Sequence, residues 1–261
     1  MEVLLIMLMA RSPKGGNMND LLNLIGSHRS IRRYKEKMID PTILKTIIEK
    51  AQYASTSSYV QAYSVIRIKN KETRKQLSQL CGDQKYIEQA AEFLVFCADL
   101  KRLHDVTIKH GKEPQEGYVE SMIIATVDAA LLGQNVMLGA ESVGLGGVFI
   151  GGIRNQPTKV CELLDIPPNV YPVFGMCLGY PDQAPDQKPR LPLKLILKEE
   201  TYTEEDISEL EHYDARVKSY YINRTRGKID HTWTEQMAEK MGGELRPHMR
   251  SYLEKWSFNK R

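Results

Sequence analysis

The segment from residue 28 to residue 34, His-Arg-Ser-Ile-Arg-Arg-Tyr, concentrates side chains that bind anions. Its three arginines fall within five residues, and like charges at this spacing repel one another unless an anion lies between them. The arginine guanidinium presents paired N–H donors that match the geometry of a phosphate, and His28 and Ser30 add short donors. The pattern predicts a phosphate site, with a solvated basic loop as the alternative.

Two further basic segments lie far along the chain. Lys188 and Arg190 belong to Lys-Pro-Arg-Leu-Pro, whose prolines stiffen the backbone and could aim both cations at one ligand. Residues 223–228, Asn-Arg-Thr-Arg-Gly-Lys, form a basic loop that could hold a second phosphate. The alternatives are a surface linker for the first segment and a solvated helix end for the second.

The glycine-rich stretch 144–152 does not fit a dinucleotide fingerprint. That fingerprint runs strand, glycine loop, helix, whereas here a helix precedes the glycines, a strand follows them, and Gly-x-Gly-x-x-Gly is absent. Gly144 is expected to end the helix. Gly151 and Gly152, at a strand end, would let the backbone approach a partner closely, such as a flat ring.

Other kinds of site lack support in the sequence. The P-loop, His-Glu-x-x-His and Gly-x-Ser-x-Gly motifs are absent, and the six histidines are scattered, so neither a hydrolase nor a metal site is expected. Cys97 and Cys177 lie in apolar runs and are expected to be core thiols. The net charge of +3 is smaller than a dedicated nucleic-acid-binding protein usually carries.

Alternating helical and strand-like patterns show which elements would position these segments. Asp40 and Pro41 open a helix whose apolar residues recur at helical spacing up to Ala54. Further helices are expected at residues 19–26, 71–80 and 157–164. Strands are expected at residues 63–69, 92–100, 147–152 and 172–180. This mixture indicates an α/β or α+β sandwich.

The longest apolar helix is expected at residues 119–143 and is apolar around nearly its whole circumference. Asp128, Gln134, Asn135 and Glu141 argue against a membrane span. Such a helix is expected to be buried on all sides, either in the core or against a second subunit.

Residues 1–17 are expected to be a non-core extension outside the fold. Their apolar run is too short to span a membrane and lacks the basic start and cleavage site of a signal peptide. We therefore expect a single domain over residues 18–261. The widely spaced cysteines and the missing secretory signal favour the reducing cytoplasm.

Several of these segments together resemble the FMN-dependent nitroreductase superfamily, and within it the branch of NADPH-dependent flavin reductases and oxygen-insensitive group A nitroreductases. The resemblance extends from about residue 20 to the C-terminus. It rests on segments that follow one another in the family's order: residues 28–34, 54–64, 82–100, 128–135, 141–155, 172–181 and 188–192.

The resemblance implies an α+β fold, a nitroreductase-like three-layer α-β-α sandwich with a mixed, mainly antiparallel sheet. It also implies an intertwined homodimer with FMN in each subunit interface. The residues from about 200 to 261 would then be a C-terminal helical excursion that serves the dimer and the nucleotide. No nucleic acid or membrane partner is expected.

The resemblance also assigns residues to the ligands. The cofactor site would comprise His28, Arg29, Ser30, Arg32, Gln84, Phe149, Ile150, Gly151, Gly152, Lys188 and Arg190, with Ser55, Thr56 and Ser57 coming from the partner subunit. Arg33 is left out of this set, because the family motif varies at its position. Arg224, Arg226 and Lys228 would hold the extra phosphate of NADPH. Ile229 and Asp230 stand where relatives carry basic residues, so the preference for NADPH over NADH stays open.

The implied activity is a two-step transfer in which NADPH, or NADH as well, passes hydride to FMN and an acceptor then takes two electrons. Nitroaromatics, quinones, azo compounds and free flavin are the candidate acceptors, and no side chain is assigned a catalytic role. One alternative is an anion- or nucleic-acid-binding protein that uses the basic tail, where Tyr220, Tyr221 and Trp233 lie among cations. Another is a flavoenzyme of the same superfamily with different chemistry.

Overall fold

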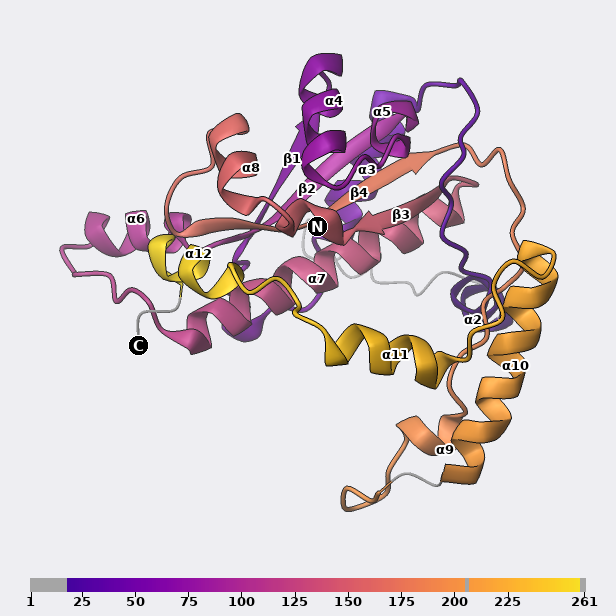
Figure 1. The fold of residues 1–261 in the computed structure, drawn as a ribbon. Helices are drawn as coiled ribbons and strands as arrows, with labels where there is room; N and C mark the ends of the chain where they lie inside the picture. The colour runs from indigo at the N-terminus through magenta and orange to yellow at the C-terminus, as the bar shows by residue number, and fades with distance from the viewer. Residues whose placement is uncertain (1–17, 205–206, 259–261) are drawn as a thin grey trace, which may run out of the picture.

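The computed structural model describes residues 18–204 and 207–258 of the chain, so the expected extension at residues 1–17 lies outside the described residues. A central sheet carries helices on both faces, and a helical arm leaves this core and returns to it (Figure 1). The expected α+β sandwich, with its mainly antiparallel sheet, is confirmed.

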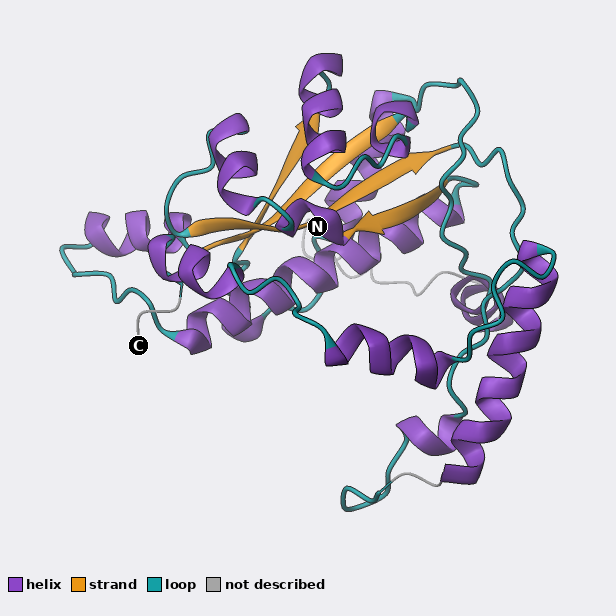
Figure 2. Ribbon diagram, in the orientation of Figure 1, coloured by secondary structure: helices purple, strands orange, loops and turns teal. Residues whose placement is uncertain are grey.

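In the described part of the chain, four strands form the sheet in the order β1-β2-β4-β3, and every neighbouring pair is antiparallel (Figure 2). The strands are β1 (Tyr63–Ile68), β2 (Glu92–Asp99), β3 (Gly146–Ile150) and β4 (Val170–Gly179). A parallel contact comes from outside them, where Ser30 forms an isolated bridge with Gly147. All eight residues of β2 are buried, as expected for a strand covered on both faces.

Two layers of helices cover the sheet. One face carries α3 (Pro41–Ala51) and α7 (Val119–Ser142), which pack on each other. The other carries α4 (Lys71–Leu80), α5 (Tyr86–Gln89) and α8 (Pro157–Leu163) (Figure 1). Three more helical elements adjoin the core: α2 (Met18–Gly26), α6 (Lys101–Lys109) and the 3-10 turn η1 (Ser57–Tyr59).

The long helix α7 is buried on one side only. Asp128, Leu132 and Val136 are buried against the core. On the opposite side Ile123, Val127 and Leu131 form a stripe, at four-residue spacing, that is between 42% and 49% exposed. The helix is long and apolar enough to cross a membrane by those criteria alone, but it packs here against β1, β2 and α3. The expectation that it is buried on all sides is therefore not met within one chain.

A helical arm follows β4. It contains α9 (Leu193–Ile196), α10 (Ile207–Thr225) and α11 (Trp233–Gly242), which lie apart from the sandwich, and α12 (Met249–Lys255), which returns to the core beside α8 (Figure 1). Leu193, Ile196 and Leu197 on the arm are each more than 60% exposed. Like the stripe on α7, these side chains leave apolar surface uncovered in the single chain.

The expected core thiols are confirmed, and the other two cysteines join them. All four are free and buried. Burial raises the pKa of the Cys81 thiol to about 12 and that of Cys161 to about 11. The thiols therefore stay protonated at neutral pH, which makes them unreactive structural groups.

Gly147 is a point of unusually close packing at the start of β3. A Cβ atom built there would lie 2.5 Å from the carbonyl oxygen of Cys177 and 2.7 Å from Cδ2 of Leu178. Both atoms belong to the neighbouring strand β4, which is paired with β3, so they cannot move away without a cost in free energy.

We expect Gly147→Ala to lower the stability of the protein by about 1–3 kcal/mol, because the added methyl group overpacks the sheet. The midpoint of thermal unfolding should fall by roughly 2–4 °C for each kcal/mol. Gly26→Ala is the matched control, since nothing lies within 4 Å of its Cβ position. Equal melting temperatures for the two variants would contradict this view of the strand contact.

Candidate functional site

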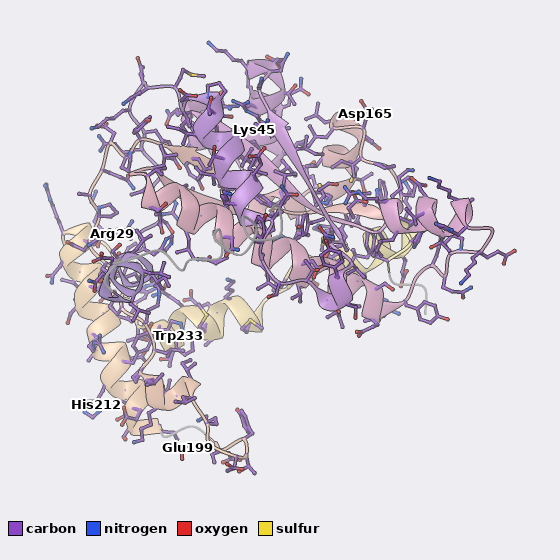
Figure 3. The ribbon with its side chains drawn as sticks, turned by 180° about the vertical axis from the view of Figure 1, so that it is seen from behind. Arg29, Lys45, Asp165, Glu199, His212 and Trp233 are labelled. Carbon is purple, nitrogen blue, oxygen red and sulfur yellow. The ribbon has the colours of Figure 1, made fainter. Side chains whose placement is uncertain are left out.

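A cavity of about 520 Å³ lies between the basic segment, residues 185–190 and helix α10. It brings together seven of the side chains expected to bind ligand: His28, Arg29, Ser30, Arg32, Lys188, Arg190 and Arg224. Figure 3 shows the labelled Arg29 beside α10, at the place where the arm meets α2. The sequence therefore predicted a real spatial cluster from three segments that are widely separated along the chain.

The backbone of the basic segment is fixed to the sheet. The Ile31 N–H donates to the carbonyl of Gly147 at 2.9 Å, and Tyr34 forms an isolated bridge with Pro181. Because side chains alternate along an extended segment, the buried Ile31 directs its neighbours Ser30 and Arg32 to the opposite side, where the cavity lies. The Tyr34 hydroxyl donates to the carbonyl of Ile31 at 2.6 Å and closes the loop.

The members of the basic segment have different environments. Nδ1 of His28 lies 2.6 Å from Oε1 of Glu141, at the end of α7. Arg29 donates to the carbonyl of Ser27 at 3.0 Å and otherwise faces the cavity. Arg33 is not part of the lining, since it points to the surface and lies 3.6 Å from the Asp182 carboxylate.

Two tyrosines on α10 form the arm side of the cavity. The Lys188 ammonium lies 5.1 Å from the centre of the Tyr221 ring, and the Arg224 guanidinium lies 5.8 Å from that of Tyr220. Arg224 also donates to the Tyr220 hydroxyl at 2.8 Å. Such cation–π contacts hold a cation near an apolar surface without neutralising it.

Sequence reasoning missed these tyrosines as parts of the site. The signal was present in the four-residue spacing from Tyr220 to Arg224 and from Tyr221 to Thr225, which puts each pair on one face of a helix. Pro185, Asp186 and Ile229 also line the cavity. Asp186 is the one carboxylate among the lining residues, so the cavity carries a clear excess of positive charge.

The expected second basic loop reaches the cavity only in part. Arg224, Thr225 and Ile229 line it, while Arg226 and Lys228 do not. Arg226 has a φ of 54° and Gly227 a φ of 79°, so the chain turns sharply there and ends α10. Both outer cations are exposed.

Gln84 and Gly152 belong to a second group of residues, outside the cavity lining. The Gln84 side chain donates to the carbonyl of Cys81 at 2.9 Å and accepts from the Tyr86 hydroxyl at 2.6 Å. A Cβ atom on Gly152 would lie 2.4 Å from that same carbonyl and 2.9 Å from Nε2 of Gln84. The close approach that Gly152 permits is therefore to protein, and it fixes the loop that carries Gln84.

Arg32 connects this group to the cavity. Burial raises the pKa of the Tyr86 phenol, and the nearby Arg32 guanidinium opposes that rise. Arg32 lines the cavity, and Tyr86 bonds Gln84, so the three side chains form a continuous polar path. Gln84 is thus placed close to the basic segment although it does not line the cavity itself.

The remaining β3 residues show mixed exposure. Phe149 is 37% exposed and packs edge-on against Phe174, with ring centres 5.1 Å apart. The Ile150 side chain is buried, so only its backbone could meet a ligand. Gly151 opens the 3-10 turn η2 (Gly151–Arg154), and the nearest atom to its Cβ position is the Arg154 guanidinium at 3.7 Å.

Ser55, Thr56 and Ser57 lie elsewhere in the same chain. The fully buried Asp128 carboxylate accepts from the N–H of Ser57 at 3.1 Å and from that of Ala62 at 3.0 Å, which anchors this loop to α7. His28, by contrast, is held at Glu141, thirteen positions further along the same helix. At about 1.5 Å per residue the two anchors are roughly 20 Å apart. The structure does not bring these three residues to the basic segment of their own chain.

Comparisons with known proteins agree in covering nearly the whole chain. The model of the nitroreductase family matches residues 25–180, and that of the nitroreductase family C-terminal domain matches residues 188–261. The chain is 42% identical over 244 residues to the NADPH-flavin oxidoreductase of Vibrio harveyi, covering 94% of this chain and 100% of the relative. It is 40% identical over 238 residues to the oxygen-insensitive NADPH nitroreductase of Salmonella typhimurium, covering 91% and 98%.

A solved structure shares the fold. The NADPH:FMN oxidoreductase of Vibrio harveyi, complexed with NAD+, matches with a TM-score of 0.86 and 40% identity, covering 92% of this chain and 99% of that one. The match includes the helical arm as well as the sandwich, because so little of either chain is left uncovered.

Proposed function

The chain belongs to the nitroreductase family, and we propose that it acts as an FMN-dependent NAD(P)H oxidoreductase. The observation that carries the proposal is the cavity that gathers His28, Arg29, Ser30 and Arg32 opposite Lys188 and Arg190. The described lining residues offer many hydrogen-bond donors and one carboxylate. Such a lining suits a phosphate monoester, which carries up to two negative charges. The residues present therefore fit the phosphate of FMN.

The chain's own residues bind and orient the ligands. The basic segment holds the phosphate from a backbone fixed on β3, and the two cations of residues 188–190 approach from the other side. Gln84, Phe149 and the backbone of residues 150–152 offer the surfaces expected beside the flavin ring. When bound, FMN supplies two-electron hydride chemistry that side chains cannot perform. No side chain is needed as a catalytic acid, so the protein's share is orientation and electrostatics.

The nucleotide is proposed to be NADPH, held through Arg224 on the arm. Arg224 lines the same cavity and is presented by Tyr220, whereas Arg226 and Lys228 are exposed nearby. The proposed acceptors are nitroaromatics, quinones, azo compounds or free flavin, taken in turn at the site that the nucleotide has left. Two relatives are named for NADPH with flavin and for NADPH with nitro compounds, which supports both halves of this reaction.

The working form is proposed to be a cytoplasmic homodimer. In each subunit residues 18–261 would act as one domain, and the excursion from about residue 200 to 261 would contact the partner subunit. The exposed stripe of Ile123, Val127 and Leu131 on α7 needs a cover, and a second copy of the helix supplies one. A partner would also supply Ser55–Ser57, which lie far from the basic segment within one chain.

Replacing Arg29 or Arg32 by Ala should weaken FMN binding by about 10- to 100-fold, since each loses a charge-assisted hydrogen bond of about 1.5–3 kcal/mol. Arg33→Ala is the matched control, because this neighbouring arginine pairs with Asp182 on the surface. Flavin fluorescence titration of the apoprotein measures all three affinities. Purified protein that is colourless and takes up no FMN would overturn the proposed function itself.

Arg224→Ala should raise the KM for NADPH about tenfold while leaving the KM for NADH within about twofold, because only NADPH carries the extra phosphate. Lys218→Ala, an exposed cation on the same helix outside the cavity, is the control and should change neither value. Steady-state kinetics with both nucleotides decides the matter. An equal rise for NADPH and NADH would remove the phosphate role of Arg224.

Leu131→Asp should raise the dissociation constant of the dimer by roughly 100-fold, because an unpaired charge in an apolar interface costs several kcal/mol. Val106→Asp on α6 is the control, since Val106 is also about half exposed but lies outside the stripe on α7. Sedimentation velocity across a range of concentrations gives the association state. A chain that sediments as a monomer before substitution would refute the dimer.

A further inference from the structure

His28 and Glu141 form the shortest contact between the proposed phosphate site and the core helix α7. Nδ1 of His28 lies 2.6 Å from Oε1 of Glu141, and the two residues are 113 positions apart in the chain. The side chains are 27% and 11% exposed, so the pair is largely shielded from water. At this distance and burial the contact is a strong, fixed hydrogen bond.

The position of Glu141 is unexpected beside a site for an anion. Its second oxygen, Oε2, is buried without a hydrogen-bond partner among the described residues. A buried carboxylate is costly unless it is paired with a positive group, and a negative charge near a phosphate weakens phosphate binding. The contact with His28 must therefore offset both costs if Glu141 is to be tolerated there.

Glu141 does not face the phosphate cavity itself. It lines a second cavity of about 400 Å³, formed with Leu24, Ser27 and Arg29, and is absent from the lining of the first. His28 shows the reverse pattern, since it lines the first cavity and not the second. The imidazole ring therefore stands between the carboxylate and the place where the phosphate would bind.

This arrangement gives the two ring nitrogens separate surroundings. Nδ1 donates to Glu141, and no described residue forms a hydrogen bond with Nε2. The contact with Glu141 fixes the plane of the ring and leaves Nε2 as the nitrogen available to a ligand in the first cavity.

We propose that Glu141 is a positioning residue for phosphate recognition: it fixes the orientation of the His28 ring, so that Nε2 faces the FMN phosphate. The proposal rests on the proposed function, because it assigns the phosphate of FMN to this cavity. Arg29 and Asp186 are the charged groups that border both cavities, and Arg32, Lys188, Arg190 and Arg224 line the first cavity together with His28. None of these groups forms a hydrogen bond with the ring, so Glu141 is its one fixed partner among the described residues.

A double-mutant cycle tests the proposal with two flavins. FMN and riboflavin differ only in the phosphate, so the ratio of their affinities isolates phosphate recognition from ring binding. Glu141→Gln, His28→Ala and the double variant are compared with the unsubstituted chain by fluorescence titration of the apoprotein. Glu120→Gln, an exposed carboxylate on the same helix, is the matched control.

Glu141→Gln should weaken FMN binding about tenfold and change riboflavin binding by less than about twofold, since about 1.4 kcal/mol corresponds to a factor of ten. In the His28→Ala background the same substitution should change FMN affinity by less than about twofold, because no ring remains to be positioned. Glu120→Gln should change neither affinity.

Three outcomes would overturn the proposal. The first is unchanged FMN affinity in Glu141→Gln. The second is an equal loss of FMN and riboflavin affinity, which is what general damage to the fold produces. The third is a tenfold loss of FMN affinity on Glu141→Gln even in the His28→Ala background. Failure of the proposed function looks different, because the unsubstituted chain would then bind neither flavin. If it binds FMN and Glu141→Gln binds equally well, only the role of Glu141 fails.

Discussion

The contact between Ile31 and Gly147 is the constraint on which the site depends. It ties an irregular, strongly basic segment to the first residues of β3, so that Ser30 and Arg32 face the cavity while Ile31 enters the core. The contact is possible because β3 begins with glycines, which let the segment and β4 both approach within van der Waals range. A larger residue at position 146 or 147 would separate the charge cluster from the sheet that gives it a fixed position.

A cluster of like charges needs this rigidity because it is unstable without an anion. Arg29, Arg32, Lys188, Arg190 and Arg224 line one cavity, where Asp186 is the one carboxylate among the described lining residues. The Lys188 ammonium and the Arg224 guanidinium lie over tyrosine rings. These contacts orient the two cations without neutralising them, which preserves the electrostatic attraction for an anionic ligand.

Much of the sandwich could be predicted from sequence because the relevant forces are local. Asp40 accepts from the N–H of Thr42 at the start of α3, and the expected helix at residues 71–80 coincides with α4. The helix expected to reach Ala54 ends at Ala51, and the strand expected through residue 152 ends at Ile150, where Gly151 enters a 3-10 turn. The helix α6 was missed, since its apolar residues are exposed or half-buried and mark no buried face.

The site was harder to predict because its side chains meet only through long-range packing. Residue types singled out Arg29, Arg32 and Lys188, but the roles of Tyr220 and Glu141 depend on where α10 and α7 end in space. Arg33 also shows that residue type alone does not decide which side chains form the site. It is an arginine like Arg29 and Arg32, yet its side chain pairs with Asp182 on the surface and does not line the cavity.

The two sides of the cavity differ in how firmly they are held, and this difference matches the two kinds of ligand proposed. His28 to Arg32 lie on backbone that is hydrogen-bonded to the sheet, whereas Arg224 lies near the end of α10, which packs on α11 of the arm. A resident cofactor gains from a preorganised site, because little side-chain or backbone freedom is lost on binding. A co-substrate that must leave in every cycle is better served by weaker binding to a less rigid element. Tight binding that is equal in the ground state and the transition state would slow its release without lowering the barrier to reaction. The division of the positive charge between core and arm would thus allow the proposed FMN site to stay occupied while the proposed nucleotide is exchanged.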